Sequence, residues 1–153
     1  MGAPIYAVST AADVNFSTVK SILGVKAHAN SGLLLKGAWV EFQGVSATGE
    51  PVLVELCYAT FATNSPGTNS TSETPVQGSG RVLTAGFTAA RAWSSEPTTL
   101  TVLEAHFIHP QAGVIYQIPL GDEYDSALAE GFVIRCTAAA AVDARAGMRV
   151  SRC

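Results

Sequence analysis

The feature that most constrains this fold is the two-residue period with which apolar residues recur along the chain. In residues 37–45, the apolar side chains of Ala38, Val40 and Phe42 alternate with a second set of mixed polarity, which is typical of a half-buried β-strand. Residues 51–63 alternate in the same way, but both of their faces are mostly apolar. We therefore expect the second strand to lie centrally in a sheet, buried on both sides.

Short connections rich in turn-forming residues separate the predicted strands, so the strands can be counted from the sequence. Three of them predict β-hairpins between consecutive strands: 30–32 between 24–29 and 33–36, 46–49 between 37–45 and 51–63, and 110–113 between 100–109 and 113–120. Residues 132–138 and 148–153 add two further strands. Helix competes with strand or loop in residues 13–22, whereas the alanine-rich run 138–146 is interpreted as a strand end and a tight connection.

These patterns predict an all-β fold with about eight to ten short strands and little helix, arranged as a β-sandwich or barrel. A length of 153 residues is that of one domain. Residues 1–16 are apolar without a clear strand period and are a candidate docking arm, which leaves 17–153 as the sandwich domain. Within it, residues 62–80 contain one charge and two prolines. They predict a long flexible loop, either lying on the surface or reaching over a neighbouring subunit.

The composition points to a surface that other molecules cover. Only 14% of the residues are charged and 48% are apolar, whereas a typical globular domain has about 25% charged residues. The net charge of −3 and the scattered arginines argue against nucleic acid as a partner. No apolar run is long enough to span a membrane, and no secretory signal is expected. Cys57, Cys136 and Cys153 are expected to be free thiols, two of them buried, with a bridge between Cys57 and Cys136 as the alternative.

The residues that could carry out chemistry do not form a recognisable arrangement. His106 and His109 are three apart, so on a strand they would face opposite sides and could not share a zinc ion. The carboxylates of Asp122, Glu123 and Asp125 form either a weak calcium site or, as we favour, a solvated turn. The sequence contains no glycine-rich phosphate loop and no nucleophile elbow. We therefore expect no catalytic, cofactor-binding or metal-binding residue, and no enzymatic activity.

Aromatic residues and arginines are the candidates for contacts with partners. Trp93 and Tyr124, if exposed beside their polar neighbours, could stack on a sugar, which is the basis of a lectin-like alternative; Trp93 could instead be a packing anchor. The last arginines of the chain could meet an acidic surface. The residues predicted to lie at an interface are Trp39, Trp93, Phe107, Arg145, Arg149 and Arg152.

Three stretches, residues 51–77, 116–136 and 140–149, resemble a family of small β proteins of actinobacteria and their phages. They read PVLVELCYATFATNSPGTNSTSETPVQ, YQIPLGDEYDSALAEGFVIRC and AAVDARAGMR. The resemblance covers most of the chain, and its motifs are strand and turn patterns. It implies a structural virion component, a decoration (cement) protein on the outside of an icosahedral phage head, and it supplies no catalytic residues.

The resemblance also implies partners and a location. Decoration proteins of tailed phages commonly form β-rich trimers at the local three-fold axes of the shell, so a homotrimer of jelly rolls bound to the major capsid protein is expected. The chain would be made in the host cytoplasm and reside on the virion. The alternative is a lectin-like or receptor-binding β module at a virion tail or a cell surface.

Overall fold

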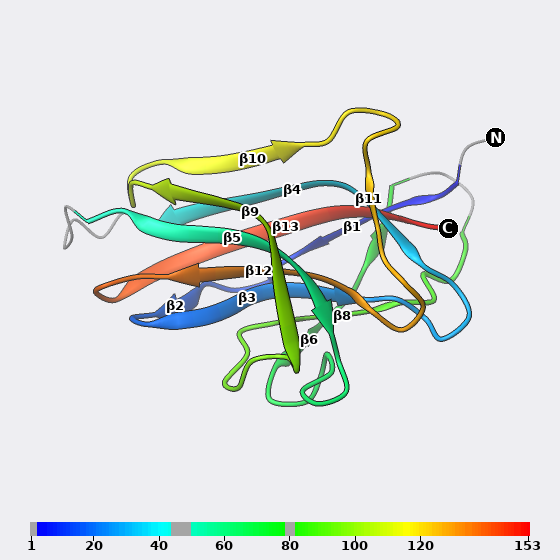
Figure 1. The fold of residues 1–153 in the computed structure, drawn as a ribbon, viewed down its shortest axis with the longest axis horizontal. Coiled ribbons are helices and arrows are strands. Elements are labelled where there is room, and N and C mark those ends of the chain that lie inside the picture. The colour runs from blue at the N-terminus through cyan, green and yellow to red at the C-terminus, as the bar shows by residue number, and fades with distance from the viewer. Residues whose placement is uncertain (1–2, 44–49, 79–81) are drawn as a thin grey trace.

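The computed structural model describes residues 3–43, 50–78 and 82–153 (Figure 1). These residues form thirteen β-strands, none of them lies in a helix, and so none belongs to a helix that could cross a membrane. Four of the strands span only two or three residues. The strands are β1 (Ile5–Ser9), β2 (Val14–Phe16), β3 (Val19–Lys26), β4 (Leu33–Gln43), β5 (Val52–Thr60), β6 (Thr71–Glu73), β7 (Val76–Gln77), β8 (Thr88–Arg91), β9 (Thr99–Ile108), β10 (Gly113–Gln117), β11 (Tyr124–Asp125), β12 (Gly131–Thr137) and β13 (Val142–Arg152).

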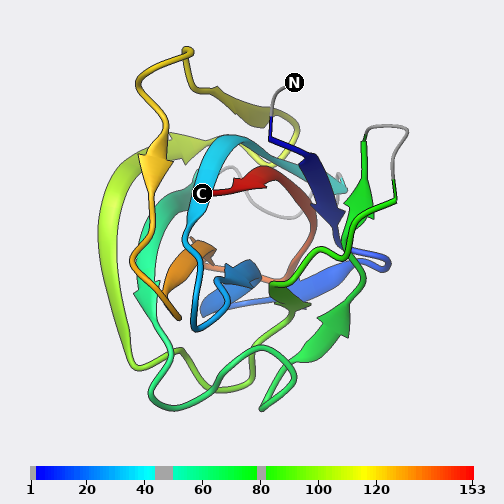
Figure 2. The same ribbon diagram turned by 90° about the vertical axis from the view of Figure 1, so that its right-hand side faces the viewer.

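The strands form two antiparallel sheets that face each other across one core (Figure 2). The seven-stranded sheet has the order β10-β4-β13-β1-β7, with β11 also paired to β4 and β2 to β13. The six-stranded sheet has the order β6-β8-β3-β12-β5-β9. The prediction of an all-β sandwich is confirmed.

The order of the strands is nested. β5 pairs with β9, β4 with β10, β3 with β12, and β1 with β13, so each early strand lies beside a later one. The early strands alternate between sheets, since β3 and β5 belong to the six-stranded sheet and β1 and β4 to the other. The chain therefore folds as a long antiparallel ribbon that crosses repeatedly from one sheet to the other.

The three predicted hairpins are wrong for this reason. β3 and β4, β4 and β5, and β9 and β10 are consecutive strands, yet each pair is divided between the two sheets. The turn at 110–113 forms, since the Ala112 amide donates to the His109 carbonyl, but it joins two sheets. The expected turn at 46–49 lies outside the described residues. Alternation indicates which side chains are buried, but it does not indicate which strand lies alongside.

The predicted faces of β5 are confirmed. Val54 and Leu56 of β5 are fully buried in the main core. Cys57 and Ala59 belong to the opposite face, where Ala59 packs with Trp93 in a second, smaller core. β5 lies between β12 and β9, as its two apolar faces predicted. Where helix competed, residues 14–16 and 19–26 form strands. The alanine-rich run is not helical, as interpreted, but only residues 138–141 are a connection, and residues 142–146 already belong to β13.

The N-terminal segment differs from its expectation as a separate arm. β1 pairs along its length with β13, and β2 also pairs with β13. Tyr6 and Val8 are buried; the Tyr6 ring contacts the edge of Phe87 at 5.5 Å, and its hydroxyl donates to the Leu83 carbonyl at 3.1 Å. Every second residue of β1 faces the core, so this segment is an internal strand of the sandwich from residue 5 onwards.

The described part of the predicted loop, residues 62–78, packs on its own subunit. It contains β6, which pairs with β8, and β7, which pairs with β1. Glu73 forms an ion pair with Arg91, and the Gly78 amide donates to the Ile5 carbonyl at 2.8 Å. The interpretation as an arm over a neighbouring subunit is therefore wrong for these residues. The short pairings of β6 and β7 fix this segment on the sandwich, although its sequence has no periodic pattern of apolar residues.

Candidate interaction surface

The outer face of the seven-stranded sheet brings together three of the six predicted interface residues. Strand register places Trp39 between Gly147 and Ile115, and Arg149 between Ala7 and Gly37. Arg145 lies opposite Glu41 on the same face. We call this surface the β4–β13 face, and it consists of Ala7, Ser9, Gly37, Trp39, Glu41, Ile115, Gln117, Arg145, Gly147 and Arg149.

Two glycines allow large side chains to lie flat on the β4–β13 face. A Cβ at Gly147 would overlap the indole of Trp39, so the ring lies directly over the backbone of β13. A Cβ at Gly37 would come within 3.4 Å of the guanidinium of Arg149. The sheet thus presents an aromatic ring and a planar cation side by side, two groups that are enriched in the energetic centres of protein interfaces.

Exposed apolar side chains surround this pair. Ile115 is 65% exposed beside Trp39, and Ile5 at 43% and Val76 at 65% border the face at its other side. Shallow hollows of about 320 and 400 Å³ lie along it, the first lined by Ile5, Lys36 and Arg149 among others, the second by Glu41 and Ile115 among others. Neither is enclosed by the protein, so this surface suits a broad contact better than a small molecule.

The arginines of this face are held in different ways. Arg145 donates from Nε to Asp13 at 2.5 Å, and its Nη1 donates to the Thr10 carbonyl at 3.4 Å. Both side chains of the ion pair are partly exposed, so it contributes at most about 1 kcal/mol. Its main effect is to fix the guanidinium at the edge of the face. Arg149 is exposed and is the more accessible cation for a partner.

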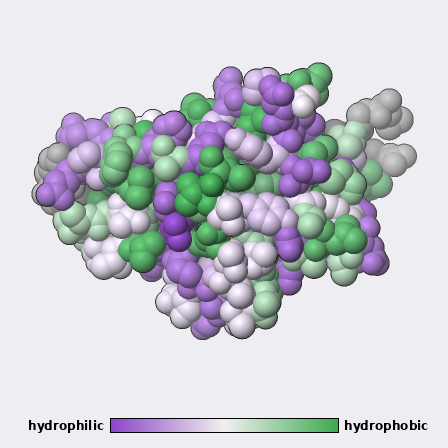
Figure 3. Space-filling view, viewed as in Figure 1, coloured by the Kyte–Doolittle hydropathy of each residue, from purple (hydrophilic) through white to green (hydrophobic). Residues whose placement is uncertain are grey.

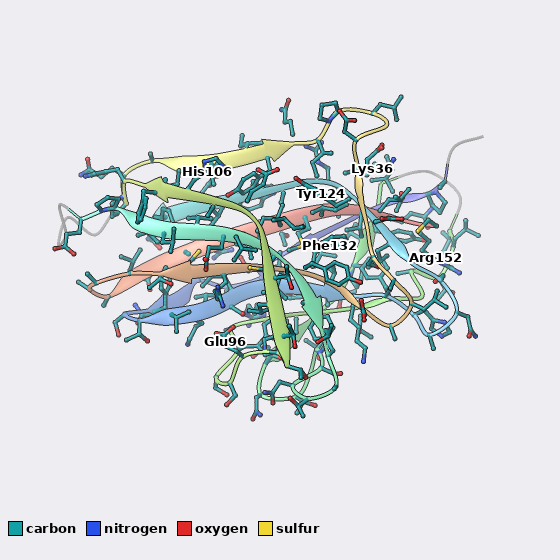
Figure 4. All side chains as sticks on the ribbon, viewed as in Figure 1. Lys36, Glu96, His106, Tyr124, Phe132 and Arg152 are labelled. Atoms are coloured by element: carbon teal, nitrogen blue, oxygen red, sulfur yellow. The ribbon has the colours of Figure 1, made fainter. Side chains whose placement is uncertain are left out.

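The other three predicted interface residues lie elsewhere. Trp93 is only 1% exposed and belongs to the smaller core, where its Nε1 donates to the Asn64 carbonyl at 2.8 Å. It is a packing anchor and cannot stack on a ligand. Phe107 is 73% exposed on β9 of the other sheet. Arg152 ends β13, lies against Gly86 and donates to the Thr84 carbonyl at 3.3 Å (Figure 4).

The free edges of the two sheets meet at a polar cluster. The Tyr124 hydroxyl donates to Glu104 at 2.9 Å, His106 Nε2 lies 3.7 Å from the other oxygen of Glu104, and the His106 and Tyr116 rings are 5.4 Å apart (Figure 4). The hydrogen bond from Tyr124 to Glu104 raises the pKa of Tyr124. Burial, then the charge of Glu104, raises the pKa of Tyr116, whose hydroxyl is buried without a partner in the described structure. These contacts join β9 to β10 and β11 across the opening of the sandwich.

Among the turn carboxylates, Glu123 is held by the protein itself. Glu123 accepts from Lys36 Nζ at 2.9 Å and from the Gly121 amide at 2.7 Å. These hydrogen bonds, the one from Lys36 first, lower the pKa of Glu123 to about 2. Across the described residues, no three side chains of His, Cys, Asp or Glu stand together as a metal site.

The cysteines are free, as expected, with Cys57 and Cys136 buried and Cys153 exposed. Cys57 lies opposite Val133 and Cys136 opposite Val54, so the two thiols are on opposite faces of one sheet and cannot bridge. Burial raises the pKa of Cys57 to about 11 and that of Cys136 even further. Neither thiol is suited to act as a nucleophile.

Sequence reasoning missed Ile115, Gly37 and Gly147 as members of the β4–β13 face. A glycine within an alternating strand is a known signal for the close approach of another group, and both glycines carry it. The sequence does not identify the side chain that approaches each glycine, since Gly147 and Trp39 are more than a hundred residues apart.

Comparisons with family models, curated proteins and solved structures find no match for this chain. The class that the fold defines is a two-sheet antiparallel β-sandwich with an aromatic and arginine-bearing outer face.

Proposed function

We propose that this chain is a structural virion component, a capsid decoration protein that assembles as a homotrimer and binds the major capsid protein on the outside of a phage head. The observation that carries the proposal is the β4–β13 face, where Trp39 and Arg149 lie flat beside exposed Ile115. A tryptophan, an arginine and exposed aliphatic side chains on one rigid sheet are the composition of an interface centre.

The strand order supports the same proposal. The nested pairing of β1, β3, β4 and β5 with β13, β12, β10 and β9 is compatible with the jelly roll proposed for this chain, an architecture that capsid proteins and lectins share. The low charged fraction of 14% agrees with a subunit whose surface is covered in an assembly. A cyclic assembly repeats one contact several times, so modest contacts add up on a particle.

The lectin-like alternative has less support. Its two candidate stacking rings were Trp93 and Tyr124, and Trp93 is buried. Tyr124 is partly exposed, but its hydroxyl is already bonded to Glu104. Trp39 is the remaining indole at the surface, and the lectin-like alternative did not rest on it.

Light scattering coupled to size exclusion tests the assembly. We expect the purified chain to have a mass that is a multiple of three times 15.8 kDa, and Trp39→Ala to weaken assembly about thirtyfold, because truncating a central tryptophan costs about 2 kcal/mol. Leu120→Ala is the matched control, since Leu120 is 92% exposed in the turn between Pro119 and Asp122 and is not among the residues of this face.

Co-sedimentation tests the location. Capsids assembled from the major capsid protein of the same genome should carry the wild-type chain and the Leu120→Ala variant into the pellet, and lose the Trp39→Ala variant. A wild-type chain that stays monomeric at every concentration and never sediments with capsids would contradict the proposal.

A further inference from the structure

The free edge of β9 is the longest unpaired strand edge in the described structure. β9 spans ten residues and has β5 as its only neighbour within its sheet, whereas the other edge strands β6, β7 and β10 span three, two and five residues. It forms the rim of the molecule in Figure 2. A long free edge is a template for a further strand, because its outward N–H and C=O groups have no partner in the sheet.

β9 has few of the devices that usually protect such an edge: its register against β5 shifts at Leu103, but Glu104 to Ile108 pair with β5 without interruption. Its sequence, Thr-Leu-Thr-Val-Leu-Glu-Ala-His-Phe-Ile, contains no proline, lysine or arginine, the residues that normally block edge pairing. None of its ten residues is buried, and Val102 at 42% and Phe107 at 73% expose apolar surface. Figure 3 views this side of the molecule and shows green apolar surface interspersed with purple along it.

The charges of β9 identify what can pair with it. In an antiparallel pairing of β9 with itself, centred on Ala105, Glu104 of each copy lies opposite His106 of the other. Both side chains are on one face of the strand, because they are two residues apart and lie opposite Leu56 and Val54 of β5. Glu104 and His106 therefore meet twice, once on each side of the two-fold axis.

A partner strand of another kind is less well supported within this chain. The other described edges are too short to match a strand of ten residues. Pairing of β9 with its own copy is closed by a two-fold axis and leaves only the three-residue strands β6 as edges of the joined sheet. We propose that β9 pairs with β9 of a second copy of this chain, joining two six-stranded sheets into one continuous sheet.

This contact is separate from the β4–β13 face. A three-fold assembly through that face and a two-fold contact through β9 are compatible, and together they would link neighbouring trimers. The β9 contact does not depend on a role in a virion, and its test uses different residues.

Cysteine cross-linking tests the register directly. Only this two-fold register places residue 105 opposite its own copy, about 4.5–5.5 Å between Cα atoms, which is within disulfide range. In a Cys153→Ser background, Ala105→Cys should give a disulfide-linked dimer on mild oxidation. Thr99→Cys is the control, since two copies of residue 99 would be about 40 Å apart along the paired strands. No dimer from Ala105→Cys, or equal dimer from Thr99→Cys, would overturn the proposal.

Charge exchange tests the pairing by an independent route. His106→Glu places carboxylates opposite each other and should weaken the two-fold association at least tenfold in sedimentation velocity. Glu104→His combined with His106→Glu restores unlike pairs and should recover most of it. Circular dichroism of each variant verifies that the sandwich is folded. A wild-type chain with no even-numbered species, or a single variant as tightly associated as wild type, would overturn the proposal.

Discussion

At the scale of single residues, this protein uses polar side chains to fix its backbone and large side chains to cover glycines. Glu123 closes its own turn through the Gly121 amide and binds Lys36 of β4. Arg149 and Trp39 lie over Gly37 and Gly147. Arg149 and Trp39 each act on a backbone position that is remote in sequence, whereas Glu123 acts on its own turn and ties it to β4. The chemistry is therefore structural at these positions.

The pKa of Glu123 gives a prediction at this scale. Its hydrogen bonds stabilise the charged form, so the folded pKa of about 2 lies below the ordinary value of 4.5. The stabilisation is fully present above about pH 4.5 and is lost as the pH falls toward 2. NMR titration of the Glu123 carboxyl carbon should give a midpoint near 2. Lys36→Met should move that midpoint toward 4.5, and an unchanged midpoint in this variant would contradict the assignment to Lys36.

At the scale of elements, the decisive feature is that short strands and loops hold the two sheets together at their edges. The segment 62–78 returns to both sheets through β6 and β7, and its Asn64 carbonyl accepts from Trp93. Trp93, Phe61 and Val133 form a separate core on the outside of the six-stranded sheet. This second core replaces the solvent that would otherwise cover the outer face of β5 and β12.

Trp93 gives a prediction for this element. Trp93→Ala should lower the free energy of unfolding by about 3–5 kcal/mol, because a fully buried indole is removed and a cavity is left. Trp93→Phe should cost less, since it keeps a ring and loses the bond from Nε1 to Asn64. Urea denaturation measures both. Phe107→Ala is the control, expected within about 0.5 kcal/mol because Phe107 is exposed in the isolated chain; equal losses for Trp93→Ala and Phe107→Ala would disprove the second core.

At the scale of the whole molecule, the two ends of the chain are structurally joined. β1 and β13 pair over five residues, from Ile5 opposite Ser151 to Ser9 opposite Gly147. β1 lies between β13 and β7, so it is an interior strand of its sheet. The fold closes only when the first and last strands meet, which is the consequence of the nested pairing.

Truncation tests this closure. Removing residues 1–10 should abolish cooperative thermal unfolding, because it removes β1 from between β13 and β7 and takes away the buried side chains of Tyr6 and Val8. A removable docking arm would instead leave the melting curve unchanged while weakening only association. Differential scanning calorimetry separates the two results, and removing residues 1–3 is the matched control, since β1 begins at Ile5.

The sequence by itself determined the class of the fold and the face on which most strand residues lie. The alternation of Val52, Val54 and Leu56 against Leu53 and Cys57 follows from strand geometry alone, and the structure has the same two faces. The sequence also indicated that two of the three cysteines would be buried, and in the structure these are Cys57 and Cys136. These properties are local, because each depends on a residue and its near neighbours.

Only the tertiary structure decided which strands are neighbours, and with them the candidate surface. The predicted hairpins are absent since β4 and β5 separate into different sheets, and the N-terminal segment without a clear period is an interior strand because β13 lies beside it. Trp39, Arg149 and Ile115 meet through pairings that span up to about 110 residues. Burial of both sheet faces favours the crossing connections over the shortest turns, and that balance is a property of the whole chain.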